Sequence, residues 1–257
     1  SYFFRILDKN KKNIFIKTGK IPFIKYISAK NINKKRNIKI PKKKWIKNPL
    51  SLALTLSVLL IGFFSAGSGQ EAPQRVITHV TGDFYRAQNN NHNSAFLITP
   101  EGIIVVDPLN EDFAEWLKQE LDERFGVPVR YVLYSHHHWD HASGGAVFED
   151  TAQFVGHANM PAHLEMPPDS TTLSDVIGQY APVAALDTNA NGQIELREAA
   201  GNDTDAPFSA FDANGDGLLS GAEVLRGPLS QVHPPTITYQ DELEITLGGK
   251  RVILEWV

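Results

Sequence analysis

The sequence contains no cysteine, so neither a disulfide bond nor a lipid-modified cysteine can stabilise or anchor the chain. It has only two methionines, Met160 and Met166, and none at its start, which indicates that the numbering includes residues upstream of the folded protein. The longest apolar run, 50–64, has about 15 residues, whereas a membrane-spanning helix needs roughly 20. These absences exclude a disulfide scaffold and argue against a stable membrane anchor.

Charge is divided unevenly along the chain. Residues 1–48 hold 16 of the 25 basic residues and one acid, Asp8, which leaves 28 of the 29 acidic residues to the rest of the chain. The basic residues are scattered among isoleucine and asparagine, without interleaved aromatic residues or a recognisable nucleic-acid-binding module. We therefore expect no nucleic-acid partner, and we interpret 1–48 as a non-native or upstream segment without assigning it a fold.

An export signal is predicted over residues 49–69. Lysines at 42–47 precede the apolar run, and small residues follow it at 65–69, which is the three-part layout of a secretory signal. The alternative is an uncleaved anchor helix, for which the run is too short. We expect cleavage near Gln70, export to the periplasm or the medium, and no membrane anchor after cleavage.

The mature chain shows the pattern of a layered α/β domain. Apolar residues at helical spacing predict a helix over 110–125, which ends at Gly126. Short apolar runs between turn residues predict strands. These are expected at 76–80, 94–99, 103–106, 129–134, 152–155, 236–239, 243–247 and 251–257. A strand, helix, strand, loop and strand in succession indicate stacked layers.

Four of the nine histidines fall within 136–141, directly after a predicted strand. His136 and His138 are two residues apart, so an extended backbone would direct both imidazoles to the same side. The loop that follows has space for a second pair of ligands, as two-metal hydrolytic sites require. Imidazole and carboxylate suit zinc, although iron and manganese accept the same ligands. The predicted zinc ligands are His136, His138, Asp140 and His141, with His137 and Trp139 facing elsewhere.

The pattern His136-x-His138-x-Asp140-His141, followed by Gly144-Gly145, resembles the signature of the metallo-β-lactamase superfamily. The resemblance covers about 76–165 and 234–257, and it implies an αββα sandwich, of class α/β or α+β, of which this chain holds the N-terminal part. It also implies a hydrolase that uses two zinc ions and a hydroxide held by them. The substrate would be a small-molecule ester, lactone, thioester, amide or sulfate ester.

The resemblance also implies roles for single residues. Asp140 would be both a metal ligand and the catalytic residue that orients the nucleophile, and Asp107 would support the metal loop from a strand end. The family's third histidine would lie just beyond Val257, so we expect the sequence to be C-terminally incomplete. His157 is the alternative ligand, but family members often carry a histidine there without using it.

The remaining histidines have no partner at metal-ligand spacing. His92 either lines the mouth of a pocket or belongs to a polar turn, and we favour the turn. His79, His163 and His233 are interpreted as surface or packing residues.

Residues 181–230 are rich in Asp, Asn and Gly and are interpreted as an insertion between the first part of the domain, 70–180, and its resumed, truncated part, 231–257. Two windows, 187–198 and 212–223, match the EF-hand loop, which binds calcium through oxygens at positions 1, 3, 5, 7 and 12 and has glycine at position 6. The predicted calcium ligands are Asp187, Asn189, Asn191, Gln193, Glu198, Asp212, Asn214, Asp216, Leu218 and Glu223.

The two windows are separated by only 13 residues, so the helices between them must be short. Ile194 and Leu219 occupy position 8, where paired EF-hand loops join. Weak extracellular-type affinity would keep such sites loaded outside the cell. We therefore expect two calcium ions with a stabilising rather than a sensing role.

Two other interpretations remain open. In one, the calcium-binding pair is the functional unit and mediates interactions, and the metallohydrolase domain is a catalytically incomplete scaffold. In the other, the chain is an inactive remnant. Calcium-dependent partner binding without zinc-dependent activity would favour the first, and weak zinc binding without catalysis would favour the second.

Overall fold

The computed structural model describes residues 2–7, 13–18, 25–26, 73–201 and 206–256. The predicted export signal at 49–69 lies outside these residues. Within the described part of the chain, no helix has the length and apolarity that crossing a membrane requires.

A seven-stranded sheet forms the centre of the fold, in the order β12-β9-β8-β7-β6-β5-β4. β4 to β7 are antiparallel neighbours, whereas β7, β8, β9 and β12 run parallel. The strands are β4 (Arg75–Thr81), β5 (Phe84–Asn89), β6 (His92–Thr99), β7 (Gly102–Val106), β8 (Val129–Leu133), β9 (Gln153–His157) and β12 (Ile237–Tyr239). Every strand predicted for this region is confirmed, but β5 was not predicted.

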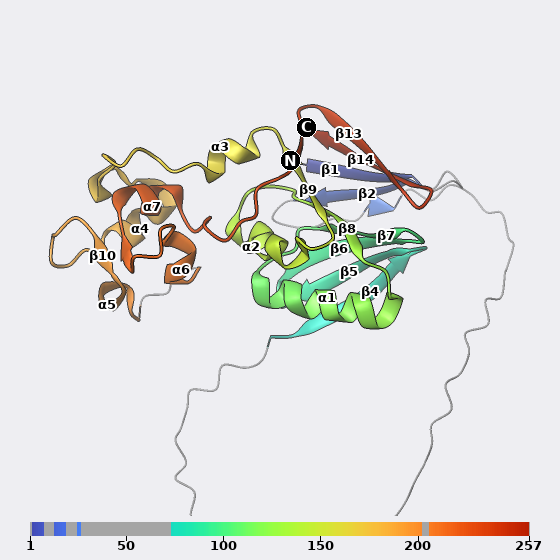
Figure 1. The fold of residues 1–257 in the computed structure, drawn as a ribbon, viewed down its shortest axis with the longest axis horizontal. Coiled ribbons are helices and arrows are strands. Elements are labelled where there is room, and N and C mark those ends of the chain that lie inside the picture. The colour runs from blue at the N-terminus through green and yellow to red at the C-terminus, as the bar shows by residue number, and fades with distance from the viewer. Residues whose placement is uncertain (1, 8–12, 19–24, 27–72, 202–205, 257) are drawn as a thin grey trace, which may run out of the picture. The chain divides into compact units, whose positions relative to one another are not determined.

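Helix α1 (Glu111–Phe125) connects β7 to β8 and covers one face of the sheet (Figure 1). It begins where the side chain of Asn110 accepts a hydrogen bond from the Phe113 N–H at 3.0 Å, and it ends at Gly126 in the left-handed conformation. Its buried face, including Phe113 and Leu117, packs against the sheet in the larger core. The predicted helix is therefore confirmed.

A second sheet, in the order β13-β14-β1-β2-β3, packs against the opposite face of the first. Ile245 and Leu254 from its described hairpin meet Ile104 and Leu133 in a shared core. Its strands are β1 (Tyr2–Leu7), β2 (Asn13–Thr18), β3 (Lys25–Tyr26), β13 (Glu242–Leu247) and β14 (Lys250–Trp256). Helix, sheet and sheet thus form three layers, a mixed α/β fold (Figure 1).

Three of these strands, β1 to β3, lie in the segment to which the sequence assigned no fold. β1 pairs with β14 in antiparallel register, with Tyr2 opposite Trp256, and β2 and β3 extend the sheet. The many basic residues of 1–48 dominated the interpretation of this segment, so the short apolar stretches in 2–7 and 13–18 were not predicted to be strands. The strands form because β14 offers an edge with which they can pair.

The insertion has a hydrophobic core of its own, formed by residues such as Ile194, Phe211 and Leu219. The helices between the two predicted calcium loops are short, as the spacing of the loops predicts. The other helices of the insertion and those between β8 and the insertion are also short. All these helices are α2 (Trp139–Ala142), η1 (Ser143–Phe148), α3 (Met160–Leu164), η2 (Leu173–Asp175), η3 (Gly178–Tyr180), α4 (Ala181–Ala184), α5 (Leu196–Ala199), α6 (Phe208–Phe211) and α7 (Gly221–Arg226). Two short strands, β10 (Ile194–Glu195) and β11 (Leu218–Leu219), pair with each other.

Candidate functional site

The candidate site lies where β7 and β8 end. Because these neighbouring strands are parallel, their carboxyl ends share one edge of the sheet, where ligands commonly bind in α/β folds. Asp107 follows β7 directly, and Ser135 and His136 follow β8. The topology therefore brings together residues that are far apart in the sequence.

Asp107 holds the start of the histidine loop in place. It is buried and has φ 53°, a left-handed conformation that aspartate tolerates better than most residues. Its carboxylate accepts hydrogen bonds from the Ser135 N–H at 2.8 Å and the Ser135 hydroxyl at 2.6 Å. The hydroxyl oxygen also lies 2.8 Å from Nδ1 of His136. A chain of contacts thus runs from the end of β7 to the first histidine.

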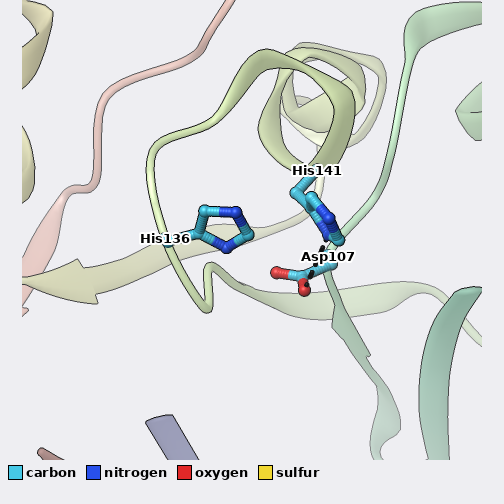
Figure 2. A group of neighbouring side chains, drawn as sticks. All are labelled: Asp107, His136 and His141. Carbon is cyan, nitrogen blue, oxygen red and sulfur yellow. Dashed lines mark ion pairs between the residues drawn. The ribbon is translucent and has the colours of Figure 1, made fainter. Parts of the chain in front are cut away.

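His136 and His141 lie side by side above this carboxylate (Figure 2). Their ring centres are 4.4 Å apart, and potential ligand atoms of Asp107, His136 and His141 all lie within 4.8 Å of one another. Nδ1 of His141 is 3.3 Å from Oδ2 of Asp107. These three residues form a group able to hold a metal ion.

The environment sets the charge of both imidazoles. Burial lowers the pKa of His136 to about 4, so its ring is neutral at pH 7 and free to donate a lone pair. Burial also opposes protonation of His141, but the carboxylates of Asp107 and Asp140 outweigh it and raise the pKa of that ring. A cation bound here would replace the proton that the two carboxylates favour on His141.

His138 and Asp140 lie next to this group without completing it. The ring centre of His138 is 4.6 Å from that of His136, and Oδ2 of Asp140 is 3.5 Å from Nε2 of His141. The four predicted zinc ligands are thus neighbours, while Asp107, interpreted as a support, takes part in the most compact group. Its closeness follows from the parallel pairing of β7 and β8, which the motif alone does not reveal.

His92 is the residue at this site that the sequence interpretation misjudged. Its Nε2 lies 3.3 Å from Oδ2 of Asp140, and its ring centre is 6.1 Å from that of His141. It begins β6 rather than belonging to a free polar turn. Its position two residues before the strand predicted at 94–99 could have indicated that His92 belongs to the sheet.

The other histidines lie in separate surroundings. His157 has both ring nitrogens engaged, Nε2 with the Gln240 carbonyl and Nδ1 with the Asn159 N–H, and it stacks on Trp256. His233 stacks on Phe154 with ring centres 3.8 Å apart. These contacts give His157 and His233 packing roles. His79 is exposed, and its Nε2 lies 2.8 Å from the Gly82 carbonyl oxygen.

His137 stacks on His163 with ring centres 4.0 Å apart, and its ring centre lies 5.0 Å from that of His138. Burial, followed by the charge of His163, lowers the pKa of His137 to about 4. An unfolded histidine titrates near 6.5, so below that pH the unfolded state binds more protons and stability falls until about pH 4. This residue therefore makes a testable contribution to acid sensitivity.

Replacing His137 with glutamine should reduce the loss of stability between pH 7 and pH 4.5 by about 1 kcal/mol, a figure discounted for the partial exposure of the ring. Urea denaturation of the zinc-free protein at both pH values measures it. The exposed His79→Gln variant is the control and should match the wild type. Identical pH dependence in all three proteins would contradict the assignment.

Replacing Asp107 with alanine should lower the free energy of unfolding by about 1–3 kcal/mol, because the buried Ser135 N–H loses its acceptor. Zinc affinity should fall about 10–100-fold, the usual effect of removing an outer partner of a metal ligand. Urea denaturation and zinc competition titration measure these effects. The control is Asp112→Ala, which removes an exposed carboxylate paired with Arg75. Unchanged zinc affinity in the Asp107 variant would show that this carboxylate does not support the site.

A cavity of about 770 Å³ opens beside the histidine loop. His92, His138 and Asp140 line one part of it, and residues of the insertion line another. A larger cavity of about 1140 Å³ lies between α1, η1 and 230–234, away from the histidine loop. The smaller cavity is therefore the one that adjoins the histidine loop.

The two loops predicted to bind calcium fold alike. β10 pairs with β11 so that Ile194 faces Leu219, both buried, which confirms the pairing expected at position 8. In the second loop, Asp212 accepts hydrogen bonds from the Gly215 and Gly217 N–H groups at 2.7 and 3.0 Å. In the first, Asp187 accepts a hydrogen bond from the Gly192 N–H, which is equivalent to Gly217, and another from the Asn191 N–H. The calcium ligand set itself stays a prediction.

The last residue of each loop closes it. Oε1 of Glu223 accepts a hydrogen bond from the Ala213 N–H at 2.9 Å, and Oε2 accepts one from the Ser220 N–H at 2.8 Å. Glu198 bonds the Thr188 N–H in the same way in the first loop. Glu223 is only 2% exposed, so its carboxylate is held facing the loop.

The fold and the histidine group define a layered α/β protein with a candidate metal centre at the carboxyl edge of its sheet. Residues 88–250 match the profile of the Metallo-beta-lactamase superfamily. The match covers more than half of the chain, and the chain belongs to this superfamily. No curated protein matches the sequence.

Several solved structures are similar. They include a metallo-beta-lactamase from Pontibacter korlensis, with 13% identity, 69% of this chain and 58% of that chain covered, and a TM-score of 0.38. The native FEZ-1 metallo-beta-lactamase from Legionella gormanii has 15% identity, with 71% and 53% covered and a TM-score of 0.41. MEM-A1, a subclass B3 metallo-beta-lactamase from a soil metagenome library, has 22% identity, with 42% and 41% covered and a TM-score of 0.34. The chain spans about half the length of these structures.

Proposed function

We propose that the protein is an exported zinc-dependent hydrolase that acts on a small-molecule ester, lactone, thioester, amide or sulfate ester. The observation that carries the proposal is the convergence of His136, His141 and Asp107 at the carboxyl edge of the sheet, beside a cavity of substrate size. Superfamily membership supports hydrolysis as the reaction class.

The residues present fit a zinc ion. Nδ1 of His141 is buried and lies 3.3 Å from Oδ2 of Asp107 without the geometry of a hydrogen bond, which leaves this nitrogen suited to a metal. His136 is held neutral by burial, and its Nδ1 is oriented by the Ser135 hydroxyl. His136, His138, Asp140 and His141 would hold the metal, with Asp107 beside them.

When bound, zinc lowers the pKa of water and polarises the oxygen of the scissile group. Asp140, which lines the cavity, would accept a hydrogen bond from the attacking water at Oδ2 and so direct its lone pair toward the substrate. His92, 3.3 Å from the same oxygen, would fix the orientation of this carboxylate. Asp107 and Ser135 would keep the loop from shifting during turnover.

We also propose that the insertion binds two calcium ions through the ligands predicted in 187–198 and 212–223. Support comes from the paired β10 and β11 and from the closing carboxylates Glu198 and Glu223. In an exported protein calcium is plentiful, so these ions would stabilise the insertion permanently. Their role would be structural, beside the zinc chemistry.

Hydrolysis assays on the zinc-loaded full chain test the main proposal. A panel of one chromogenic ester, thioester, lactone, anilide and aryl sulfate should contain at least one substrate, and a zinc chelator should abolish its turnover. Readdition of zinc should restore turnover, which separates metal loss from unfolding. Turnover that persists after zinc has been removed would contradict the proposal.

A further inference from the structure

The insertion contributes an apolar wall to the cavity beside the histidine loop. Six residues of 181–230 line this cavity, and all six are apolar: Pro182, Val183, Leu186, Ala206, Phe211 and Pro228. Val183, Ala206 and Phe211 belong to the buried core of the insertion, so the wall is backed by packed side chains. Its shape is therefore set by the fold of the insertion.

Trp139 joins this wall to the metal loop. It lies between His138 and Asp140 in the sequence, and its ring packs against both the core of the main sheet and the core of the insertion. Its Nε1 donates a hydrogen bond to Oε1 of Gln231 at 3.1 Å. A substrate held at the histidines would thus extend along Trp139 onto the apolar wall.

Among the described residues that line the cavity there is no lysine and no arginine. The other polar residues that line the cavity include Asn89, Asn110 and Gln179, which are neutral, and the one carboxylate among the described lining residues is Asp140. An anionic group on the substrate, away from the reacting bond, would find no cationic side chain there. Burying an unpaired charge costs far more than burying an apolar group of the same size.

We propose that this cavity selects substrates whose group next to the scissile bond is uncharged and apolar, such as an alkyl or aryl chain, and rejects those with a carboxylate there. The insertion is then the specificity element of the enzyme. The inference rests on the proposed function for the reaction, but the selection itself is a binding property of the cavity.

Two para-nitroanilides of matched length test the selection without requiring turnover. One is the anilide of butyric acid, which ends in a methyl group, and the other is that of succinic acid, which ends in a free carboxylate. Isothermal titration calorimetry on the zinc- and calcium-loaded full chain should give at least about tenfold tighter binding of the butyric compound. Equal or tighter binding of the succinic compound would overturn the proposal, as would binding of neither.

A charge introduced on the wall should reverse part of this preference. Pro182 is exposed on α4 and lines the cavity, whereas Ala185, also exposed at the end of α4, does not. Pro182→Lys should reduce the preference for the butyric compound at least about threefold, because its ammonium group pairs with the carboxylate. The matched control Ala185→Lys should leave the ratio unchanged. An equal ratio in both variants would contradict the placement of the wall.

Hydrolysis of the corresponding para-nitrophenyl esters, measured on the same samples, separates the two proposals. If neither ester is hydrolysed and the binding preference is present, the proposed function fails while the cavity assignment holds. If both esters are hydrolysed with equal kcat/KM and the binding ratio is near one, the cavity assignment fails while the function holds.

Discussion

Replacing His136 with alanine should lower kcat/KM of the zinc-loaded protein by on the order of a thousandfold, equivalent to about 4 kcal/mol of transition-state stabilisation. His136 stands at the centre of the group, with the rings of His138 and His141 at 4.6 and 4.4 Å and the Ser135 hydroxyl on its Nδ1. Its loss would remove one of the proposed metal ligands. Steady-state kinetics on the best substrate of the panel measures the effect.

The His163→Ala variant is the matched control, since His163 stacks on His137 outside the group and should retain most activity. Circular dichroism confirms that both variants are folded. His138→Ala should also lose activity. If His136→Ala and His138→Ala both turned over substrate at the wild-type rate, the histidine loop would not be the active site.

Calcium should raise the midpoint of thermal unfolding of the whole chain by about 5–10 °C for each ion bound, at a concentration about 100 times its Kd. Ligand binding to the folded state alone stabilises it by about 2.7 kcal/mol at that ratio, and each kcal/mol shifts the midpoint by about 2–4 °C in a domain of this size. Calcium would stabilise the loop because backbone N–H groups of that loop hold the carboxylates of Asp212 and Glu223 in place. Differential scanning calorimetry with and without calcium measures the shift.

Glu223→Gln should abolish the part of the calcium-dependent increase that comes from the second loop, because it removes the carboxylate predicted to bind through both oxygens. The variant also weakens the start of α7, where Glu223 accepts from the Ser220 N–H, so the comparison uses the increment and not the midpoint itself. Glu149→Gln, at an exposed position outside the insertion, should keep the full increment. An equal increment in both variants would disprove calcium binding by this loop.

The sequence predicts the fold best where one residue type dominates a segment. The run 103–106 is apolar throughout because β7 is buried on both faces, and the helix at 110–125 carries its own capping asparagine and terminating glycine. β5 was not predicted because only Phe84, Ala87 and Asn89 in it are buried, and polar Arg86 and Gln88 interrupt its apolar residues. Such a strand forms through pairing with β4 and β6 rather than through its own composition.

In the candidate site, too, the local sequence predicts some features, and others depend on the pairing of strands. Local spacing predicted the loop 136–141 as the site and placed His137 outside the ligand group; the ligand set stays a prediction, and His137 stacks on His163. The spacing of residues along the chain could not predict contacts between strands. Asp107 joins the group through the parallel pairing of β7 and β8, and His92 reaches Asp140 from β6. Long-range contacts of this kind depend on topology and not on neighbouring residues.

The apolar wall of the cavity shows a further limit of local patterns. Pro182, Val183 and Leu186 precede the first predicted calcium loop, and nothing in their spacing distinguishes a cavity lining from ordinary core residues. They acquire this position only because the insertion packs against Trp139. The proposed substrate selection would therefore depend on the folded insertion.

The zinc content of the purified full chain tests the central claim most directly. Inductively coupled plasma mass spectrometry after dialysis against zinc-containing and then zinc-free buffer should find at least one zinc ion per chain. The same measurement on the double variant His136→Ala, His141→Ala should find about none. A wild-type protein without bound transition metal, or a double variant that retains the full amount, would contradict the account of the histidine loop as a metal centre.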